Sequence, residues 1–144
     1  MVRQAGIVID YEKRSWQEAI RICGDLMYSA GSVQHKYIEA MIDVVLNFGP
    51  YIVVAPHIAF AHADAKYALK DDLVLAVFKE PVIFGSHNDP VHLLFGLSAV
   101  ESERHLEHLQ MLSKILEDKK ICEKLLNCTA TEEVYKIINR KVQT

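Results

Sequence analysis

Residues 49–66, GPYIVVAPHIAFAHADAK, carry the strongest strand signal of the chain and, directly after it, two histidines among small apolar residues. Residues 51–54 are aromatic or β-branched, which predicts a strand that begins after the Gly49-Pro50 break. His57 and His62 follow, five residues apart. Since apolar segments usually avoid imidazole, these two histidines are the first candidates for a functional site.

Further strand signals lie on both sides of this stretch. A continuous apolar run at 73–78 is typical of a strand covered on both faces. Turn-forming residues at 85–90 separate it from a second apolar run. Together the signals predict strands over residues 6–10, 51–54, 73–78, 82–84 and 91–100.

Helical periodicity fills the segments between and after these strands. Ser15 can cap a helix over 16–28, and Ser32 can cap a second helix that Gly49-Pro50 ends. Ser102 can cap a leucine-rich helix, and the capping-box spacing of 129–132 opens a last helix that ends near residue 140. This order of elements predicts an α/β fold, in which a mixed sheet flanked by helices forms a single domain over residues 1–144.

Composition excludes several classes of protein. A formal net charge of −3 argues against a nucleic-acid partner, because phosphate backbones are bound through clustered Lys and Arg. No apolar run approaches the roughly 20 residues of a membrane span, so we expect no direct membrane insertion. The three cysteines form no CxxC pair and fit no closed disulfide framework, which favours reduced thiols and a cytoplasmic location.

The site prediction centres on His62 and His105. In α/β sheets functional groups collect just past the strand ends, and both histidines follow predicted strands. Small neighbours leave the His62 ring accessible, and a neutral imidazole is a nucleophile toward phosphorus. His105 falls in the first turn of the helix that Ser102 can cap, where the helix dipole favours an anion. If the two preceding strands are adjacent, His62 would accept a phosphoryl group and His105 would stabilise it.

Two other interpretations stay open. Any of these histidines can be a surface or partly buried residue with only a structural role. His57, His62, His105 and His108 could also bind zinc or another transition metal, although no recognised metal-ligand motif is present and Asp64 is the carboxylate nearest the first pair. Glycine-rich phosphate loops are absent as well. We therefore expect neither a cofactor nor a metal.

Three ordered blocks resemble a known family. Residues 49–63, the block Phe84-Gly85-Ser86 with residues 88–91, and residues 105–109 (HLEHL) are similar to the enzyme IIA components of the bacterial sugar phosphotransferase system (PTS). The match is to the mannitol/fructose superfamily (type 2) and is nearest its ascorbate-type branch. It covers roughly residues 38–118, and it implies the mannitol/fructose-like enzyme IIA fold.

The resemblance implies a phosphohistidine relay. His62 would accept a phosphoryl group from the phosphocarrier protein HPr and pass it to enzyme IIB, which works with the membrane enzyme IIC. His105 would match the second active-site histidine, with His57, Asp64 and His108 as possible auxiliary residues. The family often has Pro where this chain has Ala61 and Arg where it has Asp64. A regulatory phospho-acceptor module of the same fold is the alternative function.

Partner docking is expected on an apolar surface around His62, because the phosphoryl group must pass between two proteins without hydrolysis. Ala59, Phe60, Ala61 and Ala63 fit such a surface, and a core role explains Phe60 equally well.

Overall fold

The computed structural model describes residues 2–143, apart from the side chains of Ser102, Arg104, His105 and residues 141–143. Within that range one mixed sheet has the strand order β1-β4-β5-β3-β2. The strands β1 and β4 are parallel, as are β3 and β5, whereas β4 with β5 and β2 with β3 are antiparallel. The strands are β1 Ile7–Asp10, β2 Val53–Ala55, β3 His57–Ala61, β4 Asp72–Val82 and β5 Val91–Ser98.

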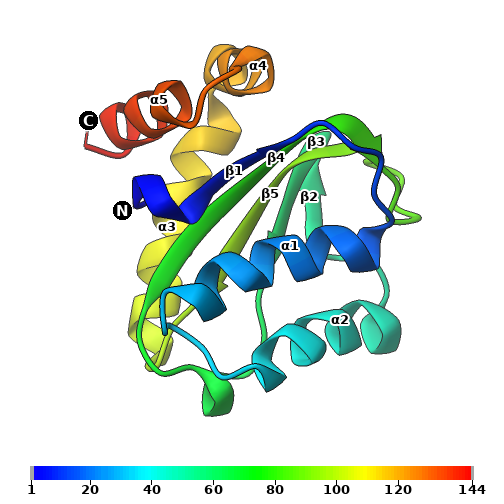
Figure 1. The fold of residues 1–144 in the computed structure, drawn as a ribbon, viewed down its shortest axis with the longest axis vertical. Coiled ribbons are helices and arrows are strands. Elements are labelled where there is room, and N and C mark those ends of the chain that lie inside the picture. Colours follow the sequence, from blue (N-terminus) through cyan, green and yellow to red (C-terminus); the bar gives the residue numbers. More distant parts are fainter. Residues whose placement is uncertain (1, 144) are drawn as a thin grey trace.

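Helices cover both faces of this sheet (Figure 1). Helices α1 (Trp16–Ser29) and α2 (Lys36–Phe48) lie on one face, and α3 (Ser102–Glu117), α4 (Lys119–Asn127) and α5 (Thr131–Gln143) lie on the other. Alternate side chains of β4 enter two separate buried clusters, so this strand is covered on both faces, as its apolar run predicts. The predicted fold class, a mixed sheet flanked by helices, is confirmed.

The 49–66 stretch forms two strands, which corrects the prediction of one strand over 51–54. Strand β2 begins at Val53, and the chain reverses at Pro56 into β3, whose last residue immediately precedes His62. His57 adopts the left-handed region with φ 74° at this reversal. The prediction ends at residue 54 and misses β3, because a left-handed histidine gives no glycine signal for the reversal.

Other element ends also differ from the prediction. The predicted strand at 73–78 and the first residue of the one predicted at 82–84 belong to one strand, β4, which ends at Val82, and β5 ends at Ser98. Ser15 does form the capping box of α1 with Glu18. Ser32 does not cap α2, because its hydroxyl donates to the buried carboxylate of Asp72 at 2.6 Å.

The caps of the last helices are shifted by one residue. Helix α3 has Glu101 as its N-cap, so Ser102 is its first helical residue. Before α5, the Glu133 carboxylate accepts from the backbone N–H of Thr129 and Ala130. None of the helices described within residues 2–143 is long and apolar enough to cross a bilayer.

Candidate active site

His62 lies at the edge of the sheet where β3 and β5 both end. These strands are neighbours and parallel, with Ala61 paired to Gly96 at the end of their ladder. The segment that follows β5 leads within a few residues into α3. The exit of β3 and the start of α3 therefore share one edge, which is the arrangement that the sequence prediction requires.

A surface cavity of about 410 Å³ opens at this edge, and the half-buried His62 is part of its lining. Helix α2, the segment after β3 and the segment before α3 all contribute to it. The charged side chains in the lining are Asp64 and Glu101, both exposed. The lining residues are Val44, His62, Ala63, Asp64, Ala65, Ala99 and Glu101. Most of them are small, which leaves room for another protein to reach the imidazole.

The His62 ring is held by its own strand. Its Nδ1 lies 3.2 Å from the carbonyl oxygen of Phe60. Because a carbonyl only accepts hydrogen bonds, this contact assigns the proton to Nδ1, and the lone pair of the neutral ring is then on Nε2. In this tautomer Nε2 is the ring nitrogen that can act as a nucleophile.

Tyr37 joins the segment after His62 to the end of β5. Its hydroxyl accepts from the backbone N–H of Ala63 at 3.0 Å and donates to the carbonyl oxygen of Leu97 at 2.6 Å. The sequence does not point to Tyr37 as a site residue, because Tyr37 lies in the apolar stripe of its helix and has the pattern of a core residue. The only signal in the sequence is a polar atom at the tip of a side chain expected to be buried.

Two further residues of the prediction belong to this edge of the sheet. The Asp64 carboxylate lines the cavity and accepts from the backbone N–H of Lys66 at 2.9 Å, which caps the short 3₁₀ helix Ala65–Tyr67. The backbone of His105 lies in the first turns of α3, at the same edge. The side chain of His105 lies outside the described residues.

The auxiliary candidates His57 and His108 are not brought together with His62. His57 begins β3, so the five-residue separation places it roughly 16 Å away along the strand. Its ring centroid lies 5.2 Å from that of His92. His108 is buried, and burial lowers its pKa from the ordinary value. It lines a separate cavity of about 280 Å³ together with Arg3 and Asp72.

The expectation that Ala59 and Ala61 belong to an apolar docking surface is wrong, and Phe60 takes the core role that the sequence also allowed. Ala59, Phe60 and Ala61 are buried in the core, because β3 lies inside the sheet between β2 and β5. Exposed apolar side chains near this edge come instead from Phe48, 68% exposed, and Tyr51, 82% exposed. Tyr51 lies beside the end of β3, because the carbonyl oxygen of its neighbour Ile52 accepts a hydrogen bond from the Phe60 N–H.

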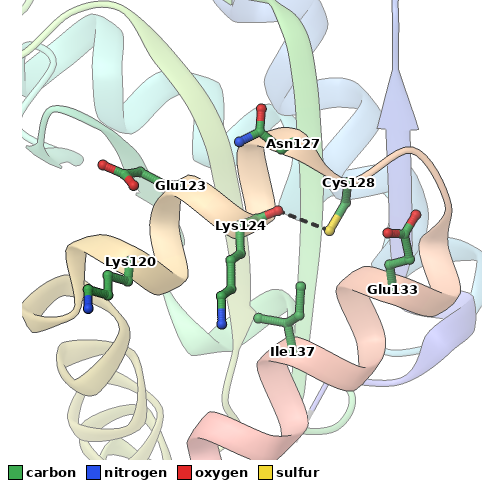
Figure 2. A pocket seen from close by; sticks show the side chains of 7 residues that line it. All are labelled: Lys120, Glu123, Lys124, Asn127, Cys128, Glu133 and Ile137. Carbon is green, nitrogen blue, oxygen red and sulfur yellow. Dashed lines mark hydrogen bonds between the residues drawn. The ribbon is translucent and has the colours of Figure 1, made fainter.

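Another cavity, of about 540 Å³, lies between α4 and α5 (Figure 2). Its candidate nucleophile is Cys128, whose Sγ donates to the carbonyl oxygen of Lys124 at 3.2 Å. Burial raises the pKa of this thiol, which disfavours the reactive thiolate. Among the described side chains, no group of three or more His, Cys, Asp and Glu residues is arranged to hold a metal ion.

Comparison with known proteins identifies the family. Residues 1–141 match the family described as "Phosphoenolpyruvate-dependent sugar phosphotransferase system, EIIA 2". The chain is 32% identical over 138 residues to the mannitol-specific cryptic phosphotransferase enzyme IIA component of Escherichia coli (strain K12), covering 95% of this chain and 94% of that protein. It is also 32% identical over 143 residues to the ascorbate-specific PTS system EIIA component of that strain, covering 97% and 93%.

Solved structures share the fold. The solution structure of the mannitol-specific cryptic phosphotransferase enzyme IIA from Escherichia coli has a TM-score of 0.88 and 31% identity, covering 96% of this chain and 95% of that chain. A chain in the complex of enzyme IIAMTL and phosphorylated enzyme IIBMTL from Escherichia coli has a TM-score of 0.85 at 24% identity, covering 97% and 98%. The chain therefore belongs to the EIIA 2 family of the phosphoenolpyruvate-dependent sugar phosphotransferase system, and it is a phosphotransferase.

Proposed function

We propose that His62 carries the phosphoryl group, which it accepts from HPr and passes to an enzyme IIB that works with a membrane enzyme IIC. The observation that supports this role is the position of His62 at the exit of β3. There the ring lines a surface cavity while its Nδ1 is held by the Phe60 carbonyl. This combination keeps the nucleophilic Nε2 oriented and within reach of a docked protein.

The transfer exchanges one nitrogen–phosphorus bond for another. Nε2 attacks the phosphorus of the phosphohistidine on the donor, and the electron pair of the broken bond returns to the donor nitrogen. The His62 ring, bonded at both nitrogens, then carries positive charge. The Phe60 carbonyl oxygen, 3.2 Å from Nδ1, stabilises that charge. In the second transfer a nucleophile of enzyme IIB attacks phosphorus, and Nε2 recovers its electron pair.

Positive charge for the phosphoryl oxygens has to come from beyond the described cavity lining, whose charged side chains are the carboxylates of Asp64 and Glu101. We assign part of this role to His105 because its backbone lies near the N-terminal end of α3, where the helix dipole favours an anion. The docked partner supplies the remainder. Phosphoryl transfer needs mainly positioning and charge stabilisation, so these few groups are sufficient.

The partners follow from the family and from one relative. The Escherichia coli complex joins enzyme IIAMTL to phosphorylated enzyme IIBMTL, which supports an enzyme IIB as the acceptor here. HPr as donor and enzyme IIC as indirect partner are expected from membership of the family. The exposed Phe48 and Tyr51 provide apolar area for short-lived docking near the cavity. Three free cysteines support a reducing, cytoplasmic location.

Labelling followed by mapping of the modified residue tests this function. Phosphoenolpyruvate, enzyme I and HPr are incubated with the protein, and the acid-labile phosphate is located by peptide mass spectrometry. Chromatography after alkaline hydrolysis then separates the two phosphohistidine isomers. We expect the phosphate on Nε2 of His62 and its loss on addition of a cognate enzyme IIB. A label on another histidine would refute the assignment.

A further inference from the structure

We propose that Tyr37 is a positioning residue for the phosphoryl transfer. Its hydroxyl fixes the backbone that carries His62 against the end of β5, and the fixed backbone aims the imidazole into the cavity. This inference rests on the proposed function of His62 as the phosphoryl acceptor, and it concerns a residue that does not line the cavity itself.

The hydroxyl of Tyr37 bridges two backbone groups on different elements. It donates to the Leu97 carbonyl oxygen at 2.6 Å and accepts from the Ala63 N–H at 3.0 Å. The Ala63 carbonyl oxygen also lies near, at 3.4 Å. Since a hydroxyl has one hydrogen, the much shorter contact with Leu97 takes it. One atom therefore serves as donor to β5 and as acceptor for the residue after His62.

This bridge lies just past the last backbone pair between β3 and β5. The parallel ladder between β3 and β5 ends at the pair Ala61 and Gly96. Beyond that pair the chain leaves the sheet through His62 and Ala63, while β5 continues to Ser98. The Tyr37 hydroxyl connects the two diverging segments directly past the end of the ladder, in place of the backbone hydrogen bonds that the ladder no longer supplies.

His62 is consequently held on both sides along the chain. Two residues before it, the Phe60 carbonyl is in contact with its Nδ1, and one residue after it, the Ala63 N–H is bound to Tyr37. A release of the Ala63 side would let the backbone rotate at His62 and change the direction of Nε2. A misplacement of about 1 Å can cost on the order of 100-fold in rate when the reaction depends on alignment.

Tyr37 itself is rigid enough for this role. It is 1% exposed and belongs to the buried cluster between the sheet and helices α1 and α2. Burial raises the pKa of its hydroxyl to about 12, so the proton that it donates to Leu97 is retained across the pH range of the cell. The packing of the ring fixes the position of the oxygen, and the oxygen fixes the backbone next to His62.

The variant Tyr37→Phe tests the hydroxyl while the ring is kept. Ser32→Ala is the matched control, because the Ser32 hydroxyl is equally buried and makes a 2.6 Å hydrogen bond, to Asp72 rather than at the cavity. We expect Tyr37→Phe to lower the maximal rate of phosphorylation by phospho-HPr on the order of tenfold. The half-saturating HPr concentration should stay the same, and Ser32→Ala should retain the wild-type rate.

Nitrogen NMR of the His62 ring provides a readout that simple destabilisation does not change. In the wild-type protein the spectrum should show the Nδ1–H tautomer, and in folded Tyr37→Phe it should move toward a mixture of tautomers. The Ala63 amide should exchange slowly with solvent in the wild type and quickly in the variant. Wild-type labelling rates together with wild-type His62 nitrogen shifts in Tyr37→Phe would overturn the proposal.

The remaining outcomes are also decisive. Should Tyr37→Phe fail to fold, exchange of the wild-type Ala63 amide at the speed of an exposed loop amide would overturn the bridge, and slow exchange would support it. Should the wild-type protein take up no label at His62, the proposed function fails by itself. The tautomer and exchange measurements then still show whether Tyr37 orients the ring.

Discussion

The two ends of β3 each carry a histidine, and the two rings lie in opposite situations. His57 begins the strand with a left-handed backbone, packs against His92 and has a buried Nδ1 without a hydrogen-bond partner in the described part of the chain. His62 follows the strand, with its Nδ1 held by Phe60 and its ring in a cavity wall. The end of β3 at which a histidine lies, rather than the composition around it, separates the ring that packs in the fold from the ring that we propose carries the phosphoryl group.

The largest expected effect is the loss of phosphorylation in His62→Gln, compared with its retention in His57→Gln. Glutamine keeps hydrogen-bonding capacity but has no nucleophilic ring nitrogen, so the first variant should take up no acid-labile phosphate. The second should be labelled at the wild-type rate, since His57 lies at the far end of β3. Labelling with enzyme I, HPr and phosphoenolpyruvate measures both variants. Absence of the label in His57→Gln would show that phosphorylation does not depend on the His62 end of β3 alone.

The next largest effect is expected for Gly96→Ala, because side chains pack tightly around Gly96 near the His62 end of β3. A Cβ at Gly96, which pairs with Ala61, would lie 2.6 Å from the Cys23 sulfur and 2.8 Å from Val74. Overpacking of this kind costs about 1–3 kcal/mol, so urea unfolding should show that loss. The displaced β5 should also slow labelling of His62.

Gly85→Ala is the matched variant near the other end of the strand. Open space surrounds a Cβ at Gly85, and its φ of +88° makes the cost a backbone cost of about 1–2 kcal/mol. Labelling of His62 should be unchanged in this variant, because Gly85 does not touch the end of the ladder between β3 and β5. Equal labelling rates for the two glycine variants would show that packing around Gly96 has no influence on His62.

Much of this comparison could be predicted from the sequence. The apolar run of β4 indicates a strand covered on both faces. The position of His62 after the strand signal predicts that it lies at a strand end, where functional groups collect in such sheets. The reversal at His57 could not be predicted, because a left-handed histidine leaves no glycine in the sequence. Tyr37 could not be assigned either, since its partners Ala63 and Leu97 are 26 and 60 residues away.

The predicted Ser32 cap fails to form for a similar reason, because Ser32 contacts a residue far away in the sequence. Its local sequence favours an N-cap, and a hydrogen bond to Asp72, 40 residues later, takes the hydroxyl instead. Local rules for caps and strands therefore hold here until a contact between distant residues competes for the same polar atom.

A smaller effect, on the free energy of unfolding, is expected from substitutions of His57, whose backbone is left-handed. His57→Gly removes the cost of a left-handed side chain and the unpaired Nδ1, and should raise the free energy of unfolding by up to about 1 kcal/mol. His57→Val puts a β-branched residue in the same conformation and should lower it by more than 1 kcal/mol, as an order of magnitude. Denaturant unfolding measures both, and destabilisation in His57→Gly would show that the ring packing on His92 outweighs the strain.

The smallest effect should come from Asp64→Asn, with Glu80→Gln as its control at the other end of the sheet. Asparagine still accepts from the Lys66 N–H, so the variant changes only the charge in the cavity wall. Less repulsion of the incoming phosphoryl group should raise the maximal labelling rate by less than about threefold, because the carboxylate is exposed and screened. The increase should shrink as salt is added, and Glu80→Gln should show none.

The half-saturating HPr concentration separates the two possible roles of Asp64. Repulsion of the phosphoryl group acts on the transfer step, so its removal changes the maximal rate. Attraction of a cation on the partner acts on docking, so its removal raises the concentration of HPr needed for half-saturation. A slower maximal rate in Asp64→Asn would contradict repulsion, whereas a higher half-saturating HPr concentration at an unchanged maximal rate would show that this carboxylate acts on docking, by attracting a positive group of the partner.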